Sequence, residues 1–188
     1  MRCVEQKILK DGYVLNNDIL KVDSFLNHQI DTEVINAFAR EVKEEFKNQK
    51  VDVILTIETS GIAVAYAAAE VFKVPLIFAK KTTSQTTVDE YYKAKIKSFT
   101  RNAVSNVIVS KKFLKKDMNV LIIDDFLAEG NAALGLLEMC QQAGAKVVGV
   151  AVVIEKIFQG GRSKLEKLGI KVFAGASIKA FENNKPVF

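Results

Sequence analysis

The chain has 188 residues, of which 49% are hydrophobic and 26% are charged, the balance of a globular domain rather than of a disordered chain. Its 27 Lys and Arg against 22 Asp and Glu give a net charge of +5, which favours an anionic partner without identifying it. Two cysteines and one histidine are too few for a disulfide framework, a four-cysteine zinc site or a multi-histidine metal site.

The first part of the chain predicts a helix, a buried strand and a second helix. Residues 31–50 place apolar residues at three- and four-residue steps, which indicates an amphipathic helix capped by Asp31 or Thr32. Residues 51–57 are mostly β-branched and apolar, typical of a strand buried on both faces. The alanine-rich segment 62–73 then predicts the helix of a β-α-β unit.

The middle of the chain is less regular. A short strand over 76–79 completes the first β-α-β unit. Residues 82–95 begin as a polar, aperiodic stretch, which favours either a loop that closes over a ligand or a plain connector. Residues 96–100 and 104–110 alternate enough to predict a hairpin between them.

The second half repeats the alternation of strands and helices. Residues 120–123 form the most apolar strand of the chain, and we expect the acidic pair that follows to end it. A helix over 131–143 and a strand over 146–154 complete a second β-α-β unit. Together the units predict an α/β fold, a mostly parallel twisted sheet with helices on both faces and ligands at the carboxyl ends of its strands.

The two ends of the chain fit this alternation poorly. We expect a single domain over 1–188 in which residues 1–30 and 170–188 pair as a small hood over the ligand edge of the sheet. No segment has the apolar length of a signal peptide or a membrane-spanning helix, so a cytoplasmic location without a membrane partner is expected.

The strongest chemical signal follows the strand over 120–123. Asp124 and Asp125 arrive at the carboxyl edge of the sheet, and a loop of small residues then opens directly into a helix, whose free N–H groups and dipole attract an anion. The carboxylates would repel a bare phosphate, but they would accept hydrogen bonds from the hydroxyl groups of a sugar phosphate. The alternative is a pair of solvated acids before an Asn-capped helix. The loop consists of Ala128, Glu129, Gly130, Asn131 and Ala132.

A second loop of the same kind lies between a strand and a helix, where Thr59, Ser60 and Gly61 offer N–H groups and hydroxyls. Two anion sites on neighbouring strand ends suit a ligand with phosphate groups at both ends. Lys80 and Lys81 end the next strand, where each is either a further ligand or a solvated charge. Neither a P-loop nor a dinucleotide-binding glycine motif occurs.

Residues 120–132 resemble the motif that binds phosphoribosyl diphosphate (PRPP) in type I phosphoribosyltransferases, which consists of an apolar strand, an acidic pair, a small-residue loop and a helix. The resemblance extends along nearly the whole chain to the xanthine-specific bacterial members. Segments 20–23, 25–31, 78–81, 98–100 and 107–110 carry this closer match.

The resemblance implies transfer of phosphoribose from PRPP to N9 of xanthine, which yields xanthosine monophosphate and diphosphate in purine salvage. It also implies a homodimer, and Mg²⁺ that is carried with PRPP rather than by a dedicated protein site.

The same resemblance implies a role for each candidate residue. Asp124 and Asp125 would hold the ribose hydroxyls, loop 128–132 would hold the 5′-phosphate, and the second loop with Lys81 would hold the diphosphate. The positions that would surround the purine base are Leu20, Asn27 and Lys156.

Two of these positions leave alternatives open. Glu129 stands where the family commonly has an uncharged residue, so we expect its side chain to point to solvent or to help cap the helix. Lys156 suits the oxo groups of xanthine, and the competing interpretation is a salt bridge with Glu155 or another acid.

Two other functions are compatible with the same motif. One is a different purine specificity, for hypoxanthine, guanine or adenine. The other is a PRPP-sensing transcriptional regulator with an added DNA-binding domain, for which about 30 residues before the first helix are too few. We therefore expect no nucleic-acid partner.

Overall fold

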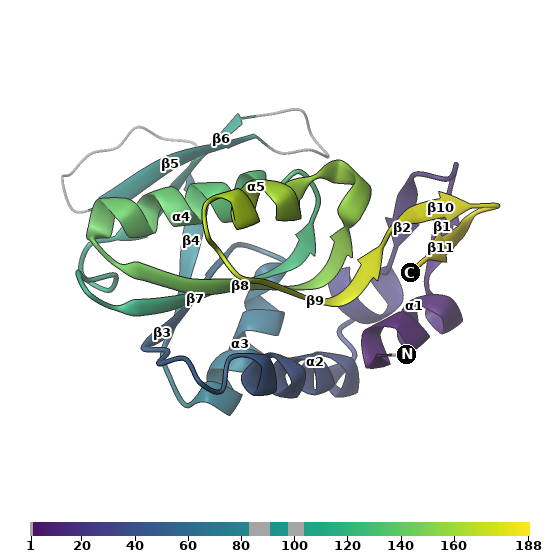
Figure 1. Ribbon diagram of the computed structural model, residues 1–188, viewed down its shortest axis with the longest axis horizontal. Coiled ribbons are helices and arrows are strands. Elements are labelled where there is room, and N and C mark those ends of the chain that lie inside the picture. Colours follow the sequence, from purple (N-terminus) through teal and green to yellow (C-terminus); the bar gives the residue numbers. More distant parts are fainter. Residues whose placement is uncertain (1, 83–90, 98–103) are drawn as a thin grey trace.

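The computed structural model describes residues 2–82, 91–97 and 104–188, and in these residues a seven-stranded sheet runs through the middle of the molecule (Figure 1). The strand order is β5-β6-β4-β3-β7-β8-β9. Five neighbouring strands are parallel: β4 (Leu76–Thr82), β3 (Val53–Ile57), β7 (Asn119–Leu127), β8 (Lys146–Lys156) and β9 (Val172–Ile178). Two antiparallel strands extend the β4 edge, β6 (Val104–Ser110) and β5 (Tyr91–Lys97).

Helices cover both faces of this sheet. One face carries α2 (Thr32–Glu45) and α3 (Gly61–Phe72), and the other carries α4 (Asn131–Ala143) and α5 (Gly161–Lys167) (Figure 1). Successive residues of β7 serve opposite faces, because Leu121 belongs to the core beneath α2 and α3 whereas Ile122 belongs to the core beneath α4. This architecture confirms the predicted fold class. None of the helices in the described part of the chain has the length and apolar character to span a bilayer.

The two ends of the chain contribute a smaller unit beside the sheet. It comprises α1 (Cys3–Asp11), the hairpin of β1 (Tyr13–Leu15) and β2 (Ile19–Lys21), the π-helical turn η1 (Asp23–Asn27), and the hairpin of β10 (Ala180–Glu182) and β11 (Lys185–Val187). The two hairpins lie side by side (Figure 1). They exchange two hydrogen bonds, from Asn17 N to Asn184 Oδ1 at 2.9 Å and from Asn184 N to Asn17 Oδ1 at 2.6 Å.

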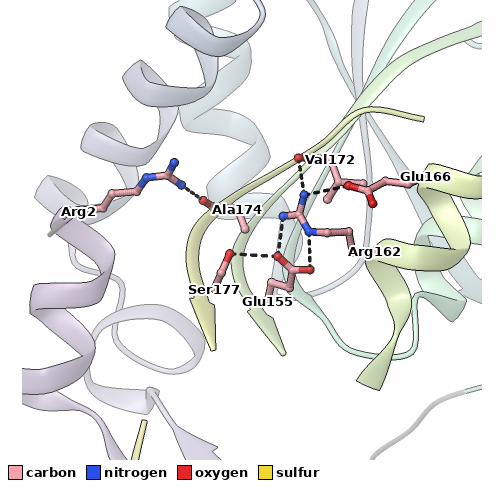
Figure 2. A network of polar contacts seen from close by, with 7 residues as sticks. All are labelled: Arg2, Glu155, Arg162, Glu166, Val172, Ala174 and Ser177. Carbon is pink, nitrogen blue, oxygen red and sulfur yellow. Dashed lines mark hydrogen bonds and ion pairs between the residues drawn. The ribbon is translucent and has the colours of Figure 1, made fainter. Parts of the chain in front are cut away.

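The expected hood is smaller than its residue ranges implied. Residues 172–178 are not part of it, because they form β9 and pair in parallel with β8. Small residues make this possible: a Cβ on Gly175 would lie 2.9 Å from the Phe38 side chain and from the Val153 carbonyl oxygen. Arg2 donates a hydrogen bond to the Ala174 carbonyl, which ties the start of α1 to this strand (Figure 2).

Two strands also differ from their predicted bounds. The hairpin is present, but its first strand begins at Tyr91 rather than at residue 96, because β5 pairs with β6 along its whole length. Most of the expected lid, residues 83–90, and the hairpin turn at 98–103 lie outside the described residues. Strand β7 does not end at the acidic pair but continues to Leu127, since it pairs with the eleven-residue β8 as far as Glu155.

Candidate functional site

A cleft of about 740 Å³ opens at the carboxyl ends of β3, β7 and β8. Its lining combines residues of the sheet edge with residues of the β1-β2 hairpin and of η1. The structure therefore brings most of the sequence-predicted site residues around one space. Those that line it are Leu20, Asn27, Ser60, Lys81, Asp124, Asp125, Ala128, Glu129, Gly130, Asn131, Ala132 and Lys156. Thr59 and Gly61 do not line it.

The acidic pair is buried rather than solvated. Asp124 is 6% exposed and Asp125 is 9% exposed, so the interpretation of two solvated acids is wrong. Asp124 Oδ1 accepts a hydrogen bond from Asp125 N, and Asp125 Oδ1 accepts one from Phe126 N, both at 2.9 Å. Burial, and then the negative charge of Asp125, hold the pKa of Asp124 well above its ordinary value. Hydroxyl donors from a ligand would offset this desolvation.

The loop over residues 128–132 presents the N-terminus of α4 to the cleft. Gly130 is the N-cap residue with φ of 84°, a left-handed conformation that favours glycine, and no side chain caps the helix. The N-terminus of this thirteen-residue helix, with its backbone N–H groups and the positive end of the helix dipole, therefore suits an anion. Glu129 Oε2 accepts a hydrogen bond from Asn131 Nδ2 at 3.0 Å, which places its carboxylate against the first turn of α4.

The second loop lies at the end of β3, and α3 begins from it without a side-chain cap. Gly61 is buried against the acidic pair: a Cβ there would overlap the Thr56 hydroxyl and lie 2.8 Å from Asp124 Oδ1. The peptide bond between Glu58 and Thr59 is cis. Glu58 Oε1 accepts a hydrogen bond from Lys81 N at 2.6 Å, so this loop and the end of β4 are joined.

The two lysines that end the predicted strand over 76–79 differ in position. Lys81 lines the cleft. Lys80 is not part of the lining, and its Nζ lies 5.8 Å from the centroid of the Phe78 ring. Of the two, Lys81 is therefore the candidate ligand.

Lys156 ends β8 at the side of the cleft next to the hairpins. Its Nζ donates to the Asp18 carbonyl oxygen at 3.0 Å and lies 5.5 Å from the centroid of the Phe181 ring. Burial lowers the pKa of Lys156, and the charge of Asp18 opposes this effect. The alternative salt bridge with Glu155 does not form, because Arg162 binds the Glu155 carboxylate instead.

Sequence reasoning missed several polar residues of the cleft, among them Asp18, Ser105 and Gln159. Gln159 lies in the 3₁₀ turn η2 (Ile157–Gln159) and lines the cleft. Its Oε1 is buried and makes no hydrogen bond within the described residues. A three-residue turn has no periodicity and matches no motif, so nothing in the sequence singles Gln159 out.

The fold and the cleft define a mostly parallel α/β domain in which the starts of two helices and a buried acidic pair line one cleft. The family of phosphoribosyl transferase domains matches residues 21–182. The xanthine phosphoribosyltransferase of Staphylococcus aureus strain JH9 is 50% identical over 185 residues, which are 98% of this chain and 96% of that protein. The chain belongs to the phosphoribosyltransferase family, as its resemblance predicted.

Solved structures show the same fold at lower identity. The adenine phosphoribosyltransferase of Giardia lamblia, complexed with 9-deazaadenine, superposes with a TM-score of 0.79 at 19% identity and covers 94% of this chain and 98% of that one. The enzyme of Saccharomyces cerevisiae superposes with a TM-score of 0.73 at 24% identity and covers 92% and 98%. Their likeness concerns the arrangement of the sheet and its helices.

Proposed function

We propose that the chain is a xanthine phosphoribosyltransferase of purine salvage. It would transfer the phosphoribosyl group of PRPP to N9 of xanthine and release xanthosine monophosphate and diphosphate. The observation that carries this proposal is that one cleft is lined by a buried acidic pair, by the starts of two helices without side-chain caps in the described residues, and by the half-buried Lys156. The relative in Staphylococcus aureus supports the choice of base.

Each part of PRPP has a counterpart in the cleft. We assign the 5′-phosphate to the N–H groups of loop 128–132 and the ribose hydroxyls to Asp124 and Asp125, whose carboxyl oxygens accept hydrogen bonds. We assign the diphosphate to the second loop and to Lys81. The ribose hydroxyls would add hydrogen-bond donors to those of the Asp125 and Phe126 backbone. These donors would offset the free-energy cost of burying the two carboxyl groups.

The reaction then needs orientation more than a covalent intermediate. As the bond from C1 of ribose to the diphosphate oxygen breaks, N9 bonds to C1 and the imidazole ring of xanthine gives up its proton to water, and the sugar is cation-like in the transition state. The electron pair of the broken bond leaves with diphosphate. Fixed positive groups and N–H donors around the departing oxygens stabilise that charge, and the cleft holds N9 and C1 at reacting distance.

The base would lie next to the hairpins. Lys156 would donate to an oxo group of xanthine or to the readily ionised ring, while Leu20 packs against the ring and Asn27 pairs with its edge. Because the Lys156 ammonium is half-buried, its hydrogen bond to the base is less screened by water than a surface contact would be.

The residues of the cleft suit a Mg²⁺ ion that arrives bound to the substrate. Asp124 and Asp125 offer the oxygen ligands that Mg²⁺ prefers, but no group of three or more His, Cys, Asp or Glu side chains is placed to hold a metal in the described ranges. We therefore propose that Mg²⁺ enters with the diphosphate of PRPP and keeps water ligands. When bound, it would neutralise part of the charge of the leaving group.

Turnover of a panel of bases tests the proposed function. Purified protein with PRPP and Mg²⁺ should convert xanthine faster than guanine, hypoxanthine or adenine, with diphosphate release as the readout. Rapid turnover of guanine or adenine without turnover of xanthine would refute the specificity. No turnover of any base, together with tight DNA binding, would favour the regulator.

We also propose that the protein is a cytoplasmic homodimer, as its resemblance implies. Static light scattering at several protein concentrations measures the mass directly, and a value near that of one 20.8 kDa chain would refute the dimer.

A further inference from the structure

Helix α5 contacts the loop over 128–132 and the Glu155 side chain, although none of its own residues lines the cleft. It begins five residues after Lys156 and follows the turn η2. Its seven residues connect the end of β8 to β9, and its first turn lies against the loop that opens into α4.

The contact with the loop over 128–132 is made to carbonyl groups of the loop, by one backbone donor and one side-chain donor of α5. Gly161 N donates to the Ala128 carbonyl oxygen at 3.0 Å, and Lys164 Nζ donates to the Glu129 carbonyl oxygen at 2.8 Å. A Cβ on Gly161 would overlap the Ala128 carbonyl oxygen and lie 2.9 Å from Gly130 N. At Gly161 the loop therefore rests directly on the backbone of α5, and Lys164 adds a side-chain contact, so a shift of α5 moves the loop.

Arg162 anchors α5 to the sheet. Its Nε donates to Glu155 Oε1 at 2.8 Å and its Nη2 to Glu155 Oε2 at 2.6 Å, a forked pair (Figure 2). Its Nη1 donates to the Val172 carbonyl oxygen at 3.0 Å, and the Ser177 hydroxyl donates to Glu155 Oε2 at 3.1 Å. The Glu155 side chain is 1% exposed and the Arg162 side chain 28%, so a buried carboxylate holds a partly exposed guanidinium.

The position of Glu155 in the sheet joins the pair to both ligand groups. Glu155 is the register partner of Leu127, which immediately precedes the loop over 128–132. It also immediately precedes Lys156, whose side chain points to the opposite face of the strand and lines the cleft. The ion pair is thus next to both groups. Across the sheet, Glu155 faces the residue that precedes the phosphate loop, and along the chain it precedes the candidate base ligand, Lys156.

We propose that Arg162 is a positioning residue that holds the phosphate loop and Lys156 at a fixed separation. This inference rests on the proposed function, because it assigns the two ends of that separation to PRPP and to xanthine. Through Glu155 the forked guanidinium fixes the end of β8, and through α5 it supports the carbonyl groups of Ala128 and Glu129. Arg162 itself contacts neither substrate.

The test replaces both residues of the ion pair, Glu155 and Arg162, in one variant. Arg162→Met alone would leave a buried, unpaired carboxylate and is expected to misfold. The double variant Glu155→Leu/Arg162→Met removes both charges at similar volume, so it should fold while losing the forked geometry. Glu166→Gln is the matched control, because it removes only the charge of the more exposed arm of the network, whose Glu166 Oε1 lies 3.3 Å from Arg162 Nη1.

The readouts separate positioning from stability. Titration calorimetry with PRPP and Mg²⁺ should show a Kd on the order of tenfold weaker in the double variant than in the wild type, since small displacements of binding groups are costly. The KM for xanthine should rise as well, with kcat within about threefold of wild type, the pattern of lost binding rather than lost chemistry. Arg162→Lys, which keeps the charge without the fork, should give an intermediate Kd.

A folded double variant with the wild-type Kd for PRPP would overturn the proposal, whatever its melting temperature. So would a Glu166→Gln variant that weakens PRPP binding as much as the double variant does. If the wild type binds PRPP but does not turn over xanthine, the proposed function fails while the titration still tests Arg162. A wild type that does not bind PRPP would refute both.

Discussion

Asp124 is the residue at which the requirements of folding and of ligand binding conflict. It lies within a strand that is otherwise apolar, and its burial against Asp125 raises its pKa. An apolar residue there would suit the sheet better, so the carboxylate is retained at a cost in stability. The need to bind the ribose hydroxyls of the proposed substrate explains why a carboxylate stands there despite that cost.

The first prediction concerns the pH dependence of this cost. A raised pKa in the folded state means that the folded protein binds the Asp124 proton more tightly than the unfolded chain. The stability therefore falls as the pH rises from the ordinary value through the raised one. Asp124→Asn removes that loss, so thermal melts should show a higher Tm at pH 7 to 8, about 2–4 °C for each kcal/mol regained, and little gain near pH 4.

Asp52 is the control with the opposite sign. A hydrogen bond from Asn119 N at 2.8 Å, together with Lys50 and the Asn119 amide, lowers the pKa of Asp52 to about 2. Its stabilisation is present above the unfolded value and is lost as the pH falls through the folded one. Asp52→Asn should therefore lower the Tm at pH 7, and an equal Tm change at every pH for either variant would contradict the prediction.

The second prediction concerns Lys156. Lys156→Ala should raise the KM for xanthine about tenfold or more, because a hydrogen bond to a charged group is worth about 1.5–3 kcal/mol. The KM for PRPP should change by less than about twofold, since the loss is confined to base binding. Steady-state kinetics with each substrate varied gives both values. Lys146→Ala, at the exposed start of the same strand, is the control, and an unchanged preference among bases would remove Lys156 from the base site.

Among the secondary-structure elements, α2 shows how one side chain serves two purposes. Asp31 Oδ1 accepts hydrogen bonds from Glu33 N at 3.0 Å and Val34 N at 3.3 Å, which caps the helix. Its Oδ2 lies 2.7 Å from Lys7 Nζ, which joins α1 to α2. The hydrogen bond to Lys7 is also the main reason for the lowered pKa of Asp31.

The third prediction separates these two contributions. Asp31→Ala should lower the free energy of unfolding by about 1 kcal/mol through loss of the cap. Asp31→Asn keeps the acceptor for the helix and loses only the charge opposite Lys7, so its Tm should stay close to that of the wild type. Thermal unfolding of both variants decides between them. Equal losses would mean that the contact with Lys7, rather than the cap, stabilises α2.

Local patterns predicted the elements whose bounds depend on local signals. The helix over 131–143 ends where predicted because Gly144, with φ of 69°, stops it in a left-handed conformation. The continuation of β7 through two aspartates was not predictable in this way, since it depends on pairing with a strand 27 residues later. The same holds for Gln159 and for the ion pair between Glu155 and Arg162. Tertiary contacts place these side chains, and no local sequence pattern predicts such contacts.

For the whole molecule, the fourth prediction concerns the contact between the two hairpins. Asn17 and Asn184 both have left-handed backbones, with φ of 50° and 57°, so replacing both with glycine keeps the conformation and removes their two hydrogen bonds. If the hairpins close the base side of the cleft, the KM for xanthine should rise severalfold, because each bond is worth about 1 kcal/mol.

The KM for PRPP in that variant should stay within about twofold of wild type, because the residues assigned to PRPP lie on the sheet edge and on its loops. Asn16→Gly, in the same turn and with φ of 53°, is the control for the glycine itself. A double variant whose two KM values rise together would show that the hairpins support the sheet edge rather than the base.

The exchange of hydrogen bonds between Asn17 and Asn184 joins residues 167 positions apart. The residues assigned to PRPP all lie between Thr59 and Ala132, whereas the second hairpin begins at Ala180. During synthesis on the ribosome, the residues assigned to PRPP are therefore made first, α5 and β9, which support them, are made next, and the hairpin contact can form only afterwards. A nascent chain would acquire its capacity for PRPP first, and the enclosure of the base would be the last part of the cleft to appear.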